Sequence, residues 1–169
     1  MKKILTLFAV VGMMAFSSCS NNDDDVDYDT IAEVYENVAP NYYNFTNANG
    51  YAVTFNFPSP IYDSDVVLVY RFDGTDTGGR PVWQALPETY YFDNGSRDFS
   101  LKYVFTYNYV NIYLDGNDQA TIPSDYRLNQ IFRIVVVPAS FAASVDKTNY
   151  LEVMKAAKLT ESQVQKIKL

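Results

Sequence analysis

The chain's single cysteine, Cys19, is the residue whose chemistry the sequence defines best. It follows two lysines near the N-terminus, an apolar run over 4–16 and the small pair Ser17-Ser18. A basic start, an apolar stretch of about 7–15 residues and small residues at a cleavage point are typical of a secretory signal peptide. The apolar run is shorter than the roughly 20 residues that cross a bilayer. We therefore predict a lipoprotein signal peptide over 1–18 and lipid attachment to the thiol of Cys19.

The residues around Cys19 resemble the start of lipoproteins from Bacteroidota, especially flavobacteria. In that group, Cys followed by Ser20 and an acidic run such as 23–25 resembles the export signal for the cell surface. The lipobox prefers Leu three positions before the cysteine, where this chain has Phe16. The resemblance covers about the first 25 residues and points to small lipoproteins with no assigned activity. It implies a diacylglycerol and a further acyl chain such as palmitate on Cys19, anchoring in the outer membrane and exposure at the cell surface.

Two segments follow the signal peptide. Residues 19–30 are polar and acidic, so we predict a flexible lipidated tether there. Asp29-Thr30-Ile31 resembles the tripeptide that Bacteroidota O-glycosylate in exported proteins, which makes Thr30 a candidate modification site. The remainder, 31–169, has the length of one domain. The chain has 13 basic and 20 acidic residues, a net charge of −7, which argues against a nucleic-acid partner.

The absence of histidine and of a second cysteine restricts the possible chemistry. It excludes Ser-His-Asp and Cys-His catalysis and the usual zinc and iron sites, so we expect no cofactor. Two facing carboxylates can hydrolyse glycosides without histidine. Glu88 is the only glutamate between Glu36 and Glu152, so its partner would have to be an aspartate. No surrounding motif supports this hydrolase alternative.

A calcium site is a second alternative, at Asp115, Asn117 and Asp118 around Gly116. Alternating Asp and Asn oxygens can supply part of the six to eight ligands that calcium takes. The full EF-hand pattern is absent because Tyr126 stands where a bidentate glutamate would be. An Asp-Gly turn explains the same residues, so our interpretation includes no metal.

Aromatic side chains are the candidates for ligand contact. The chain has 15 tyrosines and a single tryptophan. Aromatic rings on an exported β domain can stack on sugar rings or form a protein contact surface. Tyrosine also favours half-buried strands, and packing in the core explains most of them. The main candidates for ligand contact are Tyr42, Tyr43, Trp83, Tyr90 and Tyr91. Further candidates are Tyr107, Tyr109 and Tyr113.

The pattern from residue 31 onward predicts a mainly β fold. Alternating apolar residues predict strands at 51–57, 99–107 and 110–114, and continuous apolar runs predict buried strands at 66–72 and 131–137. With shorter strands at 82–86 and 90–92, and an Asn94-Gly95 hairpin turn, these indicate a single antiparallel β-sandwich-like domain, for which an immunoglobulin-like fold is one form. Helical spacing predicts a C-terminal helix at about 148–158. Thr160 and Gln163 match a capping box before a further short element.

These observations predict a lipid-anchored, non-enzymatic protein of the cell envelope. Its expected role is binding or structural, with a protein or glycan partner in addition to the membrane. A carbohydrate-binding module that uses exposed tyrosines is the first alternative. The carboxylate-dependent hydrolase is the second.

Overall fold

The computed structural model of the protein describes residues 32–142 and 145–168. The predicted signal peptide with Cys19 and the predicted tether with Thr30 lie outside these residues. Within the described ranges, no helix has the length and hydrophobicity needed to cross a membrane.

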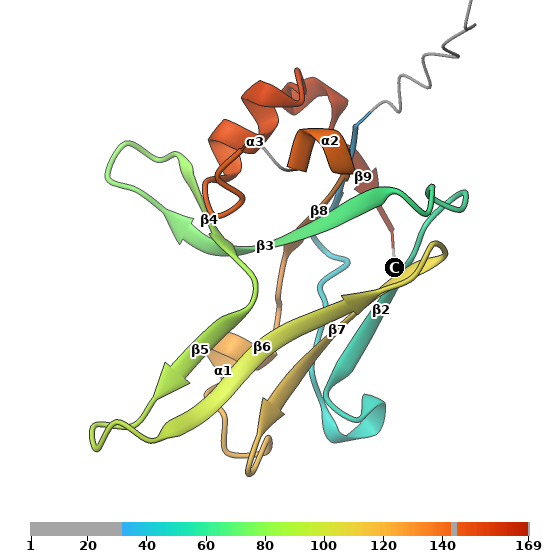
Figure 1. Cartoon of the computed structure of the whole chain (residues 1–169). Coiled ribbons are helices and arrows are strands. Elements are labelled where there is room, and N and C mark those ends of the chain that lie inside the picture. The colour runs from blue at the N-terminus through green and yellow to red at the C-terminus, as the bar shows by residue number, and fades with distance from the viewer. Residues whose placement is uncertain (1–31, 143–144, 169) are drawn as a thin grey trace, which may run out of the picture.

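Nine strands in the described part of the chain form two sheets (Figure 1). All neighbouring strands are antiparallel except β1 and β9, which are parallel. The predicted β-sandwich-like fold is therefore confirmed. The five-stranded sheet has the order β4 (Pro81–Ala85), β3 (Asp65–Thr75), β8 (Phe132–Pro138), β1 (Glu33–Asn37), β9 (Gln165–Ile167), and the four-stranded sheet has the order β2 (Ala52–Asn56), β7 (Tyr109–Gly116), β6 (Arg97–Phe105), β5 (Glu88–Tyr91).

The main core lies between the two sheets, and its residues follow the predicted alternation. Val53 and Phe55 of β2 are buried, whereas Thr54 between them is exposed. Phe99 and Leu101 of β6 also point into this core. The hydroxyl of Tyr103 donates to the Val67 carbonyl at 2.9 Å and so connects the two sheets.

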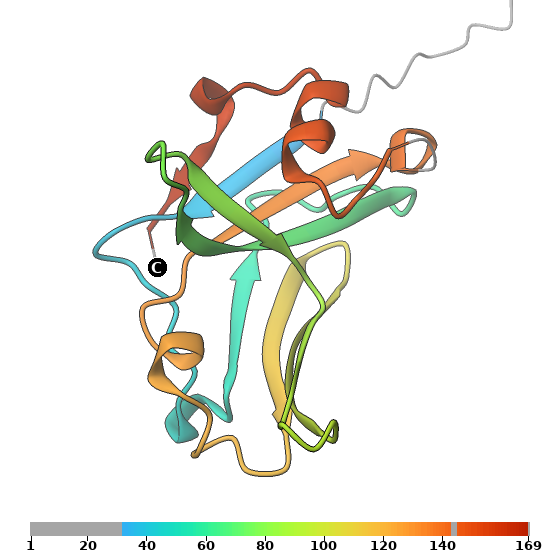
Figure 2. The ribbon, with the colours of Figure 1, turned by 90° about the vertical axis from the view of Figure 1, so that its left-hand side faces the viewer.

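A second core lies on the other face of the five-stranded sheet. The interior strands β3 and β8 are buried on both faces, as their continuous apolar runs predicted. Leu68 and Val135 pack there against Val153 and Met154 of α3 (Tyr150–Ala156). Figure 1 shows α3 and α2 (Ala139–Ala142) on the side of this sheet away from β2, β6 and β7. The domain is thus a sandwich with a helical layer on one side, seen from a second direction in Figure 2.

The C-terminal segment confirms the predicted helix and refines it. The side chain of Asn149 accepts from the backbone N–H of Glu152, so α3 begins at residue 150, two residues later than predicted. The capping box is present: the Gln163 side chain accepts from the backbone N–H of Thr160 at 2.9 Å. It caps a single 3₁₀ turn, η2 (Glu161–Gln163), which leads into β9.

The turn at Asn94-Gly95 is also confirmed. The N–H of Phe92 donates to the carbonyl of Ser96, and Gly95 has φ +81°, which glycine adopts without a steric penalty. Two further short helices are η1 (Asn47–Asn49) and α1 (Ser124–Arg127). The strand order differs from that of an immunoglobulin constant domain, whose sheets contain strands ABED and CFG.

Candidate functional site

Trp83 of β4 lines a pocket of about 870 Å³ between the β3–β4 hairpin and the segment around α3. Trp83 is partly exposed, and the ring of Tyr150 lies 5.6 Å from it. The sequence brings the two rings together because β4 pairs with β3, on which the second core is built, and α3 packs on that core. The other residues that line this Trp83 pocket include Asp76, Arg80, Asp146, Asn149, Leu151 and Glu161.

Arg133 packs against the rings of Trp83 and Tyr150 and does not itself line the Trp83 pocket. Its guanidinium carbon lies 4.2 Å from the centre of the Trp83 ring and 5.0 Å from that of Tyr150. It donates to the carboxylates of Glu36 and Glu161 and to the Tyr150 hydroxyl. Since cation–π contacts strengthen when water is excluded, this buried arginine fixes the orientation of both rings.

Three of the four charged residues that line the Trp83 pocket are acidic. Hydrogen bonds from Arg133 lower the pKa of Glu161, so this largely exposed carboxylate is charged at neutral pH. Hydrogen bonds from Thr148 lower the pKa of Asp146. Asp76 forms an exposed ion pair with Arg80 at 2.7 Å. The pocket can therefore accept hydrogen bonds from ligand hydroxyl or amine groups at several positions.

Leu151 gives the Trp83 pocket an apolar rim. Its side chain lies in the first turn of α3, and 72 % of its surface is exposed. The indole nitrogen of Trp83 is buried without a hydrogen-bond partner in the described part of the structure. A concave site with apolar and aromatic walls and a few converging polar groups is the usual form of a small-ligand site.

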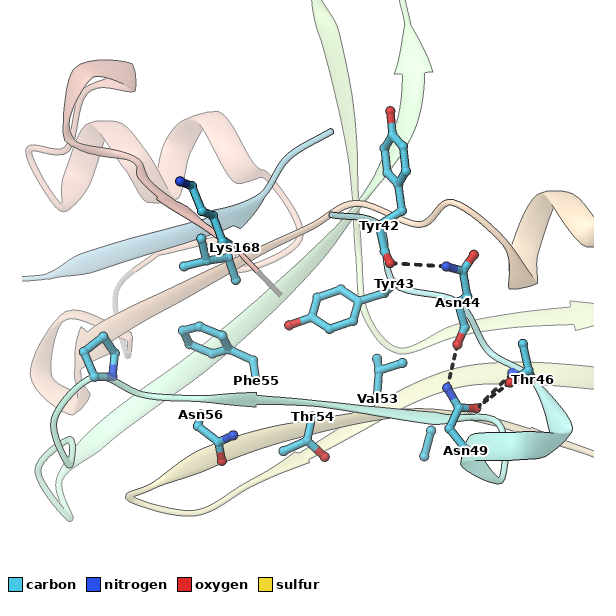
Figure 3. Close-up of a pocket in the computed structure, with 13 residues that line it drawn as sticks. Tyr42, Tyr43, Asn44, Thr46, Asn49, Val53, Thr54, Phe55, Asn56 and Lys168 are labelled. Atoms are coloured by element: carbon cyan, nitrogen blue, oxygen red, sulfur yellow. Dashed lines mark hydrogen bonds between the residues drawn. The ribbon is translucent and has the colours of Figure 1, made fainter. Parts of the chain in front are cut away.

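A second pocket, of about 790 Å³, follows the open edge of β2 and is called the β2 groove here (Figure 3). Both Tyr42 and Tyr43 line it. Tyr42 is partly exposed, whereas Tyr43 is only 5 % exposed and packs on Phe132. Burial raises the pKa of the Tyr43 hydroxyl, which has no hydrogen-bond partner among the described residues.

Tyr90 and Tyr91 lie in a third place, on β5. The ring of Tyr90 stacks on Phe99 at 4.6 Å and packs, partly buried, against the main core, whereas Tyr91 is 65 % exposed. The structure thus places the five main aromatic candidates at three sites. It brings together only Tyr42 with Tyr43 and, on β5, Tyr90 with Tyr91.

Three exposed aromatic residues lie at the β6–β7 turn: the further candidates Tyr107 and Tyr109, and Phe105, which we did not select. Phe105, Tyr107 and Tyr109 are each between 38 % and 55 % exposed. The sequence shows that these residues occupy alternate positions. It does not show that this end of the β6–β7 hairpin is left uncovered by the rest of the two sheets.

Glu88, the central residue of the hydrolase alternative, forms a buried ion pair. Arg71 Nε lies 3.0 Å from its Oε1, and both side chains are about 5 % exposed or less. Arg71 Nη2 also contacts Asp73 at 2.7 Å. Burial alone would lower the pKa of Arg71, but the hydrogen bonds to Glu88 and Asp73 raise it, so the arginine stays charged. This arrangement supports a structural role for Glu88.

The carboxylate of Asp115 faces cations. It accepts from Arg97 at 3.0 Å, and hydrogen bonding by Lys102 lowers its pKa. Asp118 accepts from the backbone N–H of Ala120 at 3.1 Å. In the described ranges, no group of three or more acidic, histidine or cysteine side chains is arranged to hold a metal ion. Calcium at Asp115, Asn117 and Asp118 stays an alternative on the sequence alone.

Arg133 is the functional residue that sequence analysis missed. It interrupts the apolar run of β8, and a charged residue within such a run is rarely buried without a partner. That signal predicts a buried ion pair. It does not predict the partners, because Glu36 and Glu161 are 97 and 28 residues away.

Comparison of the chain with protein-family models, with curated proteins and with solved structures found no match.

Proposed function

We propose that this chain is an exported lipoprotein, anchored in the outer membrane through Cys19, whose domain binds a glycan at the cell surface. The signal-like segment and the acidic residues after Cys19 support the anchor and the location. A lipid with two or more chains holds a protein stably at a membrane, whereas one chain gives only marginal binding.

The observation that carries the proposed ligand is the Trp83 pocket. The indole offers an apolar surface for the C–H groups of a sugar ring, and Leu151 extends that surface. Glu161, Asp146 and Asn149 supply acceptors and an amide for hydroxyl groups. Since Arg133 fixes the indole beforehand, little side-chain entropy is lost when a ligand binds.

The charges around the pocket favour binding over catalysis. An acid–base pair needs carboxylates that are free to exchange protons with a substrate. The three carboxylates that line the pocket instead each accept from a neighbouring side chain: Glu161 from Arg133 at 2.6 Å, Asp146 from Thr148 at 2.7 Å and Asp76 from Arg80 at 2.8 Å. We therefore propose a role without chemistry on the ligand.

Tryptophan fluorescence tests this proposal directly because Trp83 is the only tryptophan. The purified protein is titrated with oligosaccharides that it retains on a glycan array. We expect a saturable change in Trp83 emission. Leu151→Lys places a long charged chain in the pocket and should abolish the change, whereas Leu128→Lys, at a leucine that is 37 % exposed outside the pocket, should preserve it.

Two results would refute the glycan site. One is the absence of any retained glycan that alters Trp83 emission. The other is glycan binding that Tyr107→Ala abolishes and Leu151→Lys leaves intact, which would assign binding to the β6–β7 turn. The anchor is tested separately: incorporation of labelled palmitate should be lost in Cys19→Ala, and its persistence would contradict lipidation at Cys19.

A further inference from the structure

Within the described residues, the two sheets have four edge strands, and three of these edges are protected against pairing with another chain. β4 begins with Pro81, and its pairing with β3 contains an irregularity. The pairing of β5 with β6 shifts register between Tyr90 and Tyr91, and β9 has only three residues, one of them Lys166. Proline, bulges, short length and lysine are the usual protections of a sheet edge. β2, with the sequence Ala-Val-Thr-Phe-Asn, has no charge, proline or bulge.

The backbone of β2 points alternate hydrogen-bonding groups away from its sheet. Tyr51 accepts from the N–H of Leu114, and the N–H of Phe57 donates to the carbonyl of Asn108. In an antiparallel pair, alternate residues exchange such bonds, so Val53 and Phe55 bond to β7. Their even-numbered neighbours Ala52, Thr54 and Asn56 therefore direct their N–H and C=O groups toward the open edge.

The β2 groove lies along this edge and has an apolar floor. Val53, Phe55 and Ile167 line it, together with Tyr43. Figure 3 shows the Tyr43 hydroxyl directed toward the part of the pocket where Phe55 and Lys168 lie. This hydroxyl is a buried polar group without a partner in the described part of the chain, so a ligand that enters the groove gains a hydrogen bond at little cost in ordering.

We propose that β2 binds an extended peptide segment of a partner protein by strand addition. The outward groups of Ala52, Thr54 and Asn56 pair with the peptide backbone. Alternate peptide side chains are apolar and enter the β2 groove, and the intervening ones lie on the outer face of the sheet. Strand addition of this kind draws affinity from main-chain hydrogen bonds and specificity from pockets for alternate side chains.

Two observations favour a separate peptide over a second copy of β2. The apolar side chains of β2, Val53 and Phe55, are at most 9 % exposed and already belong to their own core, so a second β2 strand cannot fill the groove. Lys168 lines the groove near its Asn56 end (Figure 3) and favours a peptide with an acidic residue at that end. This inference does not depend on glycan binding, because the Trp83 pocket shares no lining residue with the groove.

Fluorescence anisotropy of labelled peptides tests the proposal. The probes are the synthetic peptides Asp-Thr-Val-Thr-Val-Thr-Val and Val-Thr-Val-Thr-Val-Thr-Asp, which cover both strand directions, and the protein is the purified full chain in detergent micelles. We expect one probe to bind saturably. N-methylation of the peptide amides on one edge should abolish binding, and N-methylation on the opposite edge should preserve it.

A variant of the protein provides the second arm. Thr54→Pro removes one outward N–H but no backbone bond to β7, and proline is tolerated on an edge strand at such a position. It also removes the hydroxyl that accepts from Asn111 of β7 at 3.0 Å, a loss that the control variant shares. Its affinity should fall by about tenfold or more, which corresponds to about 1.4 kcal/mol for the lost edge pairing. Thr54→Val keeps the N–H and should bind as the wild type does. Thermal unfolding checks that both variants fold.

Three results would overturn the proposal. The first is that neither probe binds saturably, and the second is that N-methylation has the same effect on both edges of the peptide. The third is a concentration-dependent dimer in sedimentation that is absent in Thr54→Pro. The last would assign the edge to a second copy of the chain. The N-methylation arm needs no variant, so it remains decisive if Thr54→Pro does not fold.

Discussion

Replacement of Arg71 by methionine should lower the free energy of unfolding by about 3 kcal/mol. Arg71 Nε lies 3.0 and 3.2 Å from the two carboxylate oxygens of Glu88, and Nη2 lies 3.0 Å from Oε2. The side chains are 5 % and 4 % exposed. Removal of one partner of a buried ion pair costs about 3–5 kcal/mol, because the other charge stays buried. We expect the lower end of this energy range, because the hydroxyl of Tyr90 still donates to the Glu88 carboxylate in the variant.

Urea unfolding followed by Trp83 fluorescence and circular dichroism measures this loss. With an m-value of about 2 kcal/mol/M, the midpoint should fall by about 1.5 M urea. Arg80→Met is the matched control: Arg80 also forms an ion pair at 2.7 Å, but its side chain is 83 % exposed. Solvent screens such pairs, so the midpoint of this variant should stay within error of the wild type.

A double-mutant cycle separates the ion pair from other effects of the substitution. Glu88→Gln removes the charge and keeps an acceptor for Tyr90. The double variant with Arg71→Met should lose less stability than the sum of the single variants, by about 1–3 kcal/mol. Additivity to within about 0.5 kcal/mol, or a loss below about 1 kcal/mol for Arg71→Met, would refute the argument that this pair is energetically coupled.

Two further predictions concern the second core and the four-stranded sheet. The pKa of Glu161 is lowered from its usual 4.5 in the folded protein by hydrogen bonds from Arg133. Its carboxylate therefore stabilises the fold above that usual value, and the contribution is lost as the pH falls through the lowered pKa. In thermal melts the advantage of wild type over Glu161→Gln should be largest at neutral pH and should shrink as the pH is lowered below 4.5; a difference that stays constant with pH would contradict the assignment. In Gly116→Ala the new Cβ would lie 3.1 Å from Phe99 Cβ and 3.3 Å from the Asp98 carbonyl oxygen. This crowding should lower the free energy of unfolding, measured in urea, by about 1–3 kcal/mol. Unchanged stability would show that β6 and β7 can separate there.

The amino-acid sequence predicts most strands because their patterns are local. The alternation in β2 and β6 and the apolar runs of β3 and β8 mark the faces that are buried. β1 and β9 are not individually predicted. β1 contains two glutamates that the pattern marks as exposed, but Glu36 is buried because Arg133 and Lys166 reach it from β8 and β9. β9 is only three residues long, which is too short for an alternating pattern to be recognised.

The candidate sites are less local, and the sequence finds them in part. It selects Trp83, Tyr42 and Tyr43 by residue type. It does not show that Trp83 meets Tyr150, 67 residues later, or that Arg133 lies behind both rings. The sequence also does not show that β2 is an edge strand of its sheet, because the order of strands depends on how hairpins assemble into the two sheets.

By itself, the sequence determined the class of the fold, the buried face of most strands and the restriction on chemistry set by the absence of histidine and of cysteine beyond Cys19. These are properties of composition and of local period. Only the tertiary structure decided which aromatic residues form a pocket, which charges are buried in pairs and which strand edge is open. Those outcomes depend on contacts between residues far apart in the chain, whose geometry is set by how the two sheets and the C-terminal segment pack.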